Sequence, residues 1–123
     1  MRTLLISTDK LLITMVNEFG KSGGNSVVVY EEDSDPVKVL SNILAIQPSV
    51  LIIDDDYMLP NSVSVLESIK KVNNKIKIIF VTSDSGIELG KAVSQLGIFF
   101  YAIKPVEEDE FRTLFNSIFQ SRT

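Results

Sequence analysis

The sequence contains no cysteine, no histidine and no tryptophan among its 123 residues. Without histidine, a Ser-His-Asp or Cys-His nucleophile pair and an imidazole base are excluded. Without cysteine or histidine, the ordinary zinc ligands and all disulfide or thiol redox chemistry are excluded as well. Any chemistry of this chain must therefore use carboxylates, hydroxyls, lysine or backbone amides.

Concentrated positive charge is also missing. Twelve Lys and Arg stand against 16 Asp and Glu, which gives a net charge of −4, and the densest basic group lies within residues 70–77. A nucleic-acid groove needs a concentrated basic stripe, so we expect no direct nucleic-acid partner. No apolar run has the length of a membrane span, and the N-terminus lacks the apolar core of a signal peptide. We expect a cytoplasmic protein that makes no membrane contact.

What the sequence does contain is a regular alternation of two patterns. The length suits one domain over residues 1–123, and 45% of the residues are apolar, as in globular proteins. Short runs rich in Val, Ile, Leu and Phe are typical of strands buried on both faces of a parallel sheet. These runs are Thr3–Ile6, Ser26–Tyr30, Val50–Ile53, Ile76–Val81 and Phe99–Ile103.

Each run is followed by a stretch in which apolar residues recur at helical spacing. The clearest lies near the C-terminus, from Phe111 to Phe119, and Asp35-Pro36 supplies an N-cap and a first-turn proline for the second stretch. The pattern predicts five βα units. Right-handed crossovers arrange such units as an open α/β structure, a doubly wound five-stranded parallel sheet with helices on both faces.

Polar residues stand where three of these strands end, which is the edge at which such sheets place their chemistry. Asp54, Asp55 and Asp56 follow the third strand; they form either a solvated turn or a placed nucleophile or metal ligand. Thr82 closes the fourth strand and Lys104, followed by a proline, closes the fifth. A carboxylate, a hydroxyl and an ammonium that converge on one pocket suit a phosphoryl group.

With these residues in view, the sequence resembles the receiver domain of bacterial two-component response regulators over nearly its whole length. The segment Pro48–Asp54 looks like the strand that ends in the family's phosphoacceptor aspartate. Thr82 lies 28 residues after Asp54, where the family has its phosphate-contacting hydroxyl, and Lys104 lies 22 residues after Thr82. Tyr101 takes the place of the family's switch aromatic. The resemblance implies a flavodoxin-like (βα)5 fold with strand order 2-1-3-4-5.

The resemblance also implies a function, a signalling switch rather than a turnover enzyme. Asp54 would accept a phosphoryl group from a sensor histidine kinase or a phosphotransfer protein, and Lys104 would pair with the phosphoryl oxygens. Thr82 and Tyr101 would then move and alter the surface of the fourth helix, fifth strand and fifth helix. The chain leaves no room for a DNA-binding module after Phe119, so we expect the output to come from a separate protein or from another domain of a longer chain.

One pair of positions departs from the family pattern. Receiver domains end their first strand with two adjacent acids that hold Mg²⁺, and Ser7 and Thr8 stand in those positions here. Because Mg²⁺ prefers carboxylates and water, we predict weak binding. We also expect Asp55 to point away from Asp54, and Asp56 to offer its backbone carbonyl. The candidate metal ligands are Asp9, which we also expect to cap the first helix, Asp54 and Asp56.

Two alternative functions would place the chain in other classes of protein. The missing acids favour a phosphorylation-independent pseudo-receiver that acts as a protein–protein interaction module, whereas the retained Asp54, Thr82 and Lys104 argue against it. A flavin-binding protein of the same topology is disfavoured, because the segment Ser7–Leu12 passes directly into a helix instead of a phosphate loop. The apolar run Phe99–Ile103 could support a homodimer, although core packing explains it more simply.

Overall fold

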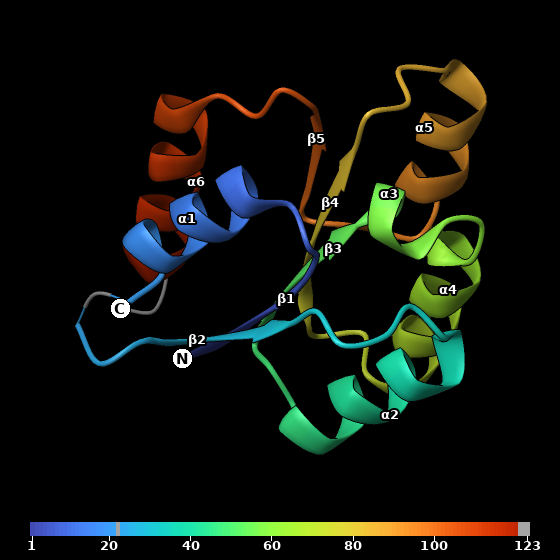
Figure 1. The fold of residues 1–123 in the computed structure, drawn as a ribbon, viewed down its shortest axis with the longest axis horizontal. Helices are drawn as coiled ribbons and strands as arrows, with labels where there is room; N and C mark the ends of the chain where they lie inside the picture. The colour runs from blue at the N-terminus through green and yellow to red at the C-terminus, as the bar shows by residue number, and fades with distance from the viewer. Residues whose placement is uncertain (22, 121–123) are drawn as a thin grey trace.

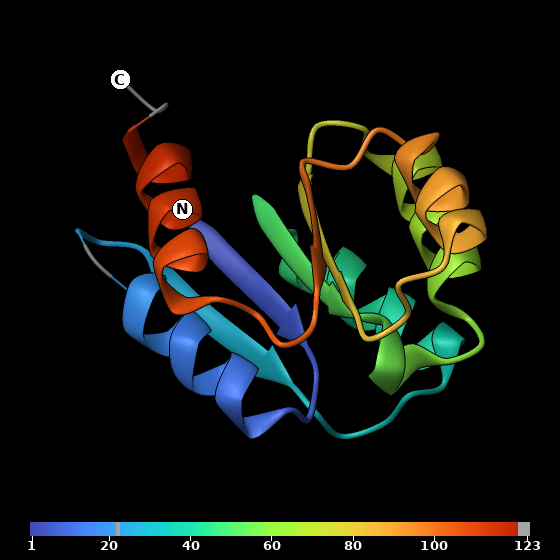
Figure 2. The ribbon, with the colours of Figure 1, turned by 90° about the horizontal axis from the view of Figure 1, so that it is seen from above.

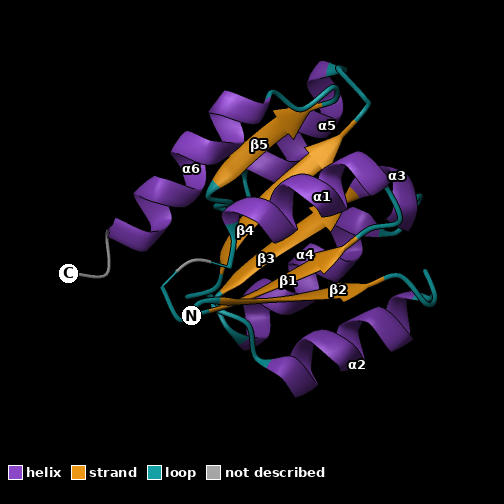
Figure 3. Ribbon diagram, turned by 60° about the vertical axis from the view of Figure 1, so that its left-hand side comes forward, coloured by secondary structure: helices purple, strands orange, loops and turns teal. Residues whose placement is uncertain are grey.

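The computed structural model describes residues 1–21 and 23–120. Its sheet has five parallel strands in the order β2-β1-β3-β4-β5, as Figure 3 shows. The strands agree with the predicted runs to within one residue at each end. They are β1 (Arg2–Ile6), β2 (Ser26–Tyr30), β3 (Val50–Asp54), β4 (Lys77–Thr82) and β5 (Phe100–Ile103). The predicted doubly wound sheet is therefore confirmed.

Helices cover both faces of the sheet. One face carries α1 (Lys10–Phe19) and α6 (Glu108–Gln120), and the other carries α2 (Pro36–Ile46), α4 (Ser62–Val72) and α5 (Ile87–Ser94), as Figures 1 and 2 show. A further one-turn helix, α3 (Asp55–Met58), directly follows β3. The sequence analysis missed α3 because a single turn is too short to show a period. No helix of the described residues is long and apolar enough to cross a membrane.

The helix ends show where local sequence rules hold and where they fail. Asp9 caps α1 as predicted: its Oδ1 accepts the amides of Leu11 and Leu12 at 3.1 and 3.2 Å. Asp35 stands at the N-cap of α2 with Pro36 in the first turn, as predicted, but the Asp35 side chain makes no capping hydrogen bond. The amide of Asp35 instead donates to Oδ1 of Asp33 at 2.8 Å, which ties the two acids into a local turn.

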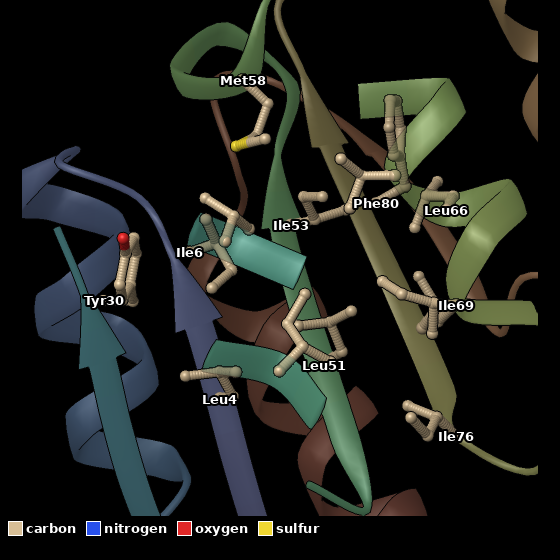
Figure 4. Packing of buried hydrophobic residues seen from close by; sticks show 14 of the residues in the cluster. Leu4, Ile6, Tyr30, Leu51, Ile53, Met58, Leu66, Ile69, Ile76 and Phe80 are labelled. Atoms are coloured by element: carbon tan, nitrogen blue, oxygen red, sulfur yellow. The ribbon is translucent and has the colours of Figure 1, made fainter. Parts of the chain in front are cut away.

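Two apolar clusters hold the layers together, one on each face of the sheet. Alternate residues of each strand point to opposite faces, so Leu4 and Ile6 join one cluster while Leu5 joins the other. Figure 4 shows the first cluster, in which strand residues such as Phe80 pack against Leu66 and Ile69 of α4. All five residues of β3 are buried, as expected for a central strand between two helix layers. The end of this strand, Asp54, is therefore buried at the carboxyl edge together with Ser7 and Thr82.

The burial of two phenylalanines predicts a clear difference in how much each contributes to the free energy of unfolding. Phe115 is 1% exposed in α6 and Phe99 is 43% exposed before β5. We expect Phe115→Ala to lower the free energy of unfolding by about 3 to 5 kcal/mol, because it removes apolar contacts and leaves a cavity. Phe99→Ala should lower it by less than about 1 kcal/mol. Urea unfolding followed by circular dichroism measures both, and equal losses would contradict this description of the core.

Candidate functional site

Lys104 is the centre of a cluster of charges at the carboxyl edge of the sheet. Its Nζ lies 3.0 Å from an Oδ2 atom of each of three aspartates, Asp9, Asp54 and Asp56. An ammonium group has three protons, so it can donate one to each carboxylate. The structure therefore brings Lys104 together with the predicted phosphoacceptor and with the other two candidate metal ligands.

Asp54 is the most enclosed member of this cluster. It is the last residue of β3, is 2% exposed, and has both carboxylate oxygens in hydrogen bonds. Its Oδ2 accepts the Ser7 hydroxyl at 2.6 Å as well as Lys104, and its Oδ1 accepts the Asp56 amide at 3.1 Å. The Asp54 carboxylate is thus satisfied by neutral donors and one ammonium.

Ser7 is a site residue that the sequence analysis counted only as a missing acid. Ile6 pairs with Ile53 in the sheet, so the residues that follow them, Ser7 and Asp54, lie side by side. Ser7 is fully buried, and its oxygen also accepts the Asp9 amide at 3.0 Å, whereas Thr8 is exposed. This role could have been inferred from the predicted strand order, which places the end of β1 beside the end of β3.

Asp56 takes part through its side chain. Its Oδ2 faces Lys104 and its Oδ1 accepts the Ser83 hydroxyl at 2.6 Å. The contact of the Asp56 side chain with Lys104 comes in addition to the backbone carbonyl that was predicted as a metal ligand, which stays a prediction. The sequence analysis also missed Ser83, the residue after β4, although it follows the predicted site residue Thr82 directly.

Asp55 points away from Asp54, as predicted, into a separate buried network. Its carboxylate accepts the hydroxyls of Ser62 and Thr82, the latter at 2.8 Å. The predicted convergence of Asp54, Thr82 and Lys104 on one pocket is therefore only partly found. Asp54 and Lys104 are in contact, but the hydroxyl of Thr82 donates to Asp55.

Tyr101 lies in β5 next to Phe80 of β4. The two rings stack with centroids 5.4 Å apart and planes inclined by 27°. Among the described residues, the Tyr101 hydroxyl is buried without a hydrogen-bond partner. Burial raises the pKa of this hydroxyl, and the charges of Asp84 and Asp55 raise it further. The ring therefore lies in the first apolar cluster, close to the Asp55 network.

The charge cluster changes the pKa of its members in opposite directions. Burial alone would lower the pKa of Lys104, but the hydrogen bonds that its ammonium donates to Asp54, Asp9 and Asp56 outweigh burial and raise this pKa. Burial likewise opposes ionisation of Asp9 and Asp56, yet the hydrogen bonds that they accept leave the pKa of each carboxyl below 3.8. All of these charges are therefore present at neutral pH.

The donor set of this cluster is suited to a cation. Carboxylate oxygens are the ligands that Mg²⁺ prefers, and Asp9, Asp54 and Asp56 direct one oxygen each at a common point. That point is held by the Lys104 ammonium. These oxygens are of the kind that a divalent ion prefers, but such an ion would have to displace Lys104 from them. The described residues include no group of three or more acids arranged to hold a metal ion.

An apolar cavity of about 370 Å³ lies beside the cluster. It lies between α1 and the segment that follows β5, with Asp9 and Lys104 in its wall. Its apolar lining consists of Leu11, Leu12, Met15, Pro105 and Val106. The charged site is therefore bordered by a surface on which another molecule can rest apolar groups.

No protein-family model and no curated protein sequence matches the chain. Its structure does match solved structures, many of which are receiver domains of response regulators. A signal receiver domain from Vibrio parahaemolyticus has a TM-score of 0.76 and 20% identity, with 98% of this chain and 90% of that chain covered. The receiver domain of a Francisella response regulator has a TM-score of 0.76 and 21% identity, covering 99% and 98%.

A phosphorylated cyanobacterial phytochrome response regulator is similar as well. Its TM-score is 0.73 at 15% identity, and the match covers 95% of this chain and 89% of that chain. At identities this low the likeness establishes the fold, not the chemistry. The chain has the fold of response-regulator receiver domains, as the sequence predicted.

The Lys104 cluster predicts a pH-dependent loss of stability. Because Asp9 and Asp56 have pKa values below 3.8 in the fold, their contribution is present above 3.8 and lost as the pH falls through the folded values. Lys104→Met leaves the three carboxylates without their cation, so we expect it to lower the free energy of unfolding by about 2 kcal/mol at neutral pH. The loss should shrink as the pH falls below 3.8 and Asp9 and Asp56 become protonated.

Urea unfolding with a chelator present, at a series of acidic to neutral pH values, measures this difference. Lys38→Met is the matched control, because the ion pair of Lys38 in the described part of the chain is an exposed one with Asp33. Its effect should be small at every pH. A Lys104→Met loss that stays constant across the series would contradict the electrostatic account.

Proposed function

We propose that this chain is a phosphoacceptor switch of a two-component phosphorelay, with Asp54 as the residue that is phosphorylated. The observation that carries the proposal is the environment of one atom. Oδ2 of Asp54 accepts both the Lys104 ammonium at 3.0 Å and the Ser7 hydroxyl at 2.6 Å, at the carboxyl edge of a receiver-type sheet. The solved neighbours support the proposal, since one of them is itself phosphorylated.

In the proposed reaction a sensor histidine kinase or a phosphotransfer protein supplies the phosphoryl group from a phosphohistidine. An Asp54 carboxylate oxygen attacks phosphorus and the P–N bond breaks, with its electron pair going to nitrogen. The imidazole, already protonated on its other ring nitrogen in the phosphohistidine, leaves as the neutral ring. Lys104 follows the phosphoryl oxygens and neutralises part of the added charge. The apolar cavity beside Asp9 and Lys104 offers a place for the donor protein to rest near the acceptor.

The chain then acts as a switch rather than a turnover enzyme. Thr82 would turn to the phosphoryl group and Tyr101 would change its rotamer against Phe80. The surface that would change is formed by α5, β5 and α6, and it includes the exposed apolar side chains of Ile87 and Ile103. A separate output protein, another domain or a second copy of the chain in the cytoplasm would bind this surface.

Mg²⁺ has a secondary place in this proposal. Asp9, Asp54 and Asp56 would hold it, and the bound ion would supply positive charge to the phosphoryl oxygens. Because Lys104 occupies the point that these carboxylates share, we expect the affinity to be low.

The second candidate is a pseudo-receiver that binds a partner protein without phosphorylation. The observation that favours it is that Ser7 and Lys104 satisfy Asp54 without a metal ion. A carboxylate held in this way is a stable structural element as well as a candidate nucleophile. The two candidates differ in one measurable property, the modification of Asp54.

Phosphorylation of Asp54 is tested with acetyl phosphate and Mg²⁺, followed by a phosphate-affinity gel. We expect a shifted band that hydroxylamine removes, because it cleaves acyl phosphates. Asp54→Asn should abolish the band. Asp109→Asn is the matched control, since Asp109 is an exposed acid of α6 that pairs with Arg112 and lies outside the site, and it should keep the band. If neither acetyl phosphate nor a phosphorylated kinase domain modifies the parent chain, the phosphoacceptor proposal is wrong. The pseudo-receiver is then the remaining candidate.

The two positions of the missing acids predict different responses to Mg²⁺. Ser7→Asp places a new carboxylate beside Asp54, so we expect Mg²⁺ to bind roughly tenfold more tightly than to the parent. Thr8→Asp changes an exposed side chain and should leave the affinity nearly unchanged. Isothermal titration calorimetry of the three proteins measures this, and three equal affinities would refute our explanation of weak binding.

A further inference from the structure

Asp55 is a buried carboxylate for which the proposed phosphoryl transfer has no use. It is 2% exposed, and the ion pairs of the described residues do not include it. Two hydroxyls donate to it instead, Ser62 to Oδ1 and Thr82 to Oδ2. A buried charge that lacks a cation depends on such hydrogen bonds, so losing either of them is unfavourable.

Thr82 has only one proton to donate. Its hydroxyl is fully buried, donates to Asp55 at 2.8 Å and accepts the amide of Asp84 at 3.0 Å. A threonine hydroxyl has a single O–H donor. Thr82 can therefore not donate to a group on Asp54 while it donates to Asp55.

We propose that Asp55 is a positioning residue that holds the Thr82 hydroxyl in its resting orientation and so sets how readily the switch closes. Ser62 fixes the other oxygen of Asp55 and thereby its orientation. When Thr82 turns to a phosphoryl group on Asp54, a buried carboxylate loses a hydrogen bond. Asp55 thus opposes the turn of Thr82 that phosphorylation favours, and the inference rests on the proposed function.

The arrangement of neighbouring side chains makes this role specific. Asp54 and Asp56 face Lys104, and Asp55 lies between them in sequence but faces Thr82. Ser83, the residue after Thr82, donates its hydroxyl to Asp56 at 2.6 Å and not to Asp55. Ser83 therefore provides a control that perturbs an adjacent hydroxyl without releasing Thr82.

The resting contact is tested first, in the unphosphorylated chain. Three-bond couplings to the Thr82 methyl group, measured by NMR, report the χ1 rotamer of this residue. We expect one rotamer in the parent chain, in Ser83→Ala and in Asp55→Asn, whose amide oxygen can still accept the hydroxyl. Asp55→Ala should show rotamer averaging. Should Asp55→Ala not fold, Asp55→Ser removes the same contact, since its side chain is too short to reach Thr82.

The effect on the switch is tested with the same proteins after treatment with acetyl phosphate and Mg²⁺. In the phosphorylated chains we expect Asp55→Ala to raise the ratio of switched to resting Thr82 and Tyr101 signals by about tenfold over the parent. Asp55→Asn and Ser83→Ala should stay near the parent ratio. If Asp55→Asn keeps the parent ratio while Asp55→Ala does not, the effect comes from the position of Thr82 and not from a general loosening of the fold.

The outcomes separate this inference from the proposed function. A single Thr82 rotamer in Asp55→Ala, or an unchanged ratio in its phosphorylated form, overturns the role of Asp55 and leaves phosphorylation of Asp54 untouched. Absence of phosphorylation in the parent and in every variant overturns the proposed function, and the role of Asp55 in the switch with it. Rotamer averaging of Thr82 in Asp55→Ala, together with the raised ratio of switched to resting signals in its phosphorylated form, establishes the role of Asp55 and the proposed function.

Discussion

The contact of one ammonium group with three carboxylates determines how the carboxyl edge of this sheet is built. Lys104 joins residues from the loop before α1, from the end of β3 and from α3, each at 3.0 Å. Without it, three negative charges would be crowded at one edge in a setting of low dielectric constant. The hydroxyls of Ser7 and Ser83 and the amide of Asp56 complete the hydrogen bonds of these carboxylates.

The run of three aspartates is divided between two networks. Asp54 and Asp56 face the ammonium and the open edge of the sheet, whereas Asp55 faces the interior with Thr82 and Ser62. This division gives adjacent residues different chemical roles. The residues facing Lys104 can exchange one charged partner for another, while those around Asp55 lose a hydrogen bond whenever one of them moves.

Local sequence rules predicted much of this structure. The apolar runs located every strand to within a residue, because a strand buried on both faces must be apolar throughout. The cap made by Asp9 and the orientation of Asp55 away from Asp54 were also predicted correctly from position. Asp35 holds the N-cap position of α2 as predicted, but its side chain makes no capping hydrogen bond. The one-turn helix α3 was missed because four residues carry no period.

By itself, the sequence determined the order of the elements, the exclusion of imidazole and thiol chemistry, and the presence of acids and Lys104 at strand ends. Only the tertiary structure decided which oxygen meets which donor. Ser7 and Asp54 are 47 residues apart, and Lys104 and Asp54 are 50 apart. Contacts over such separations depend on strand register and side-chain rotamer, and no local pattern encodes either. For the same reason, the partner of Thr82 proved to be Asp55.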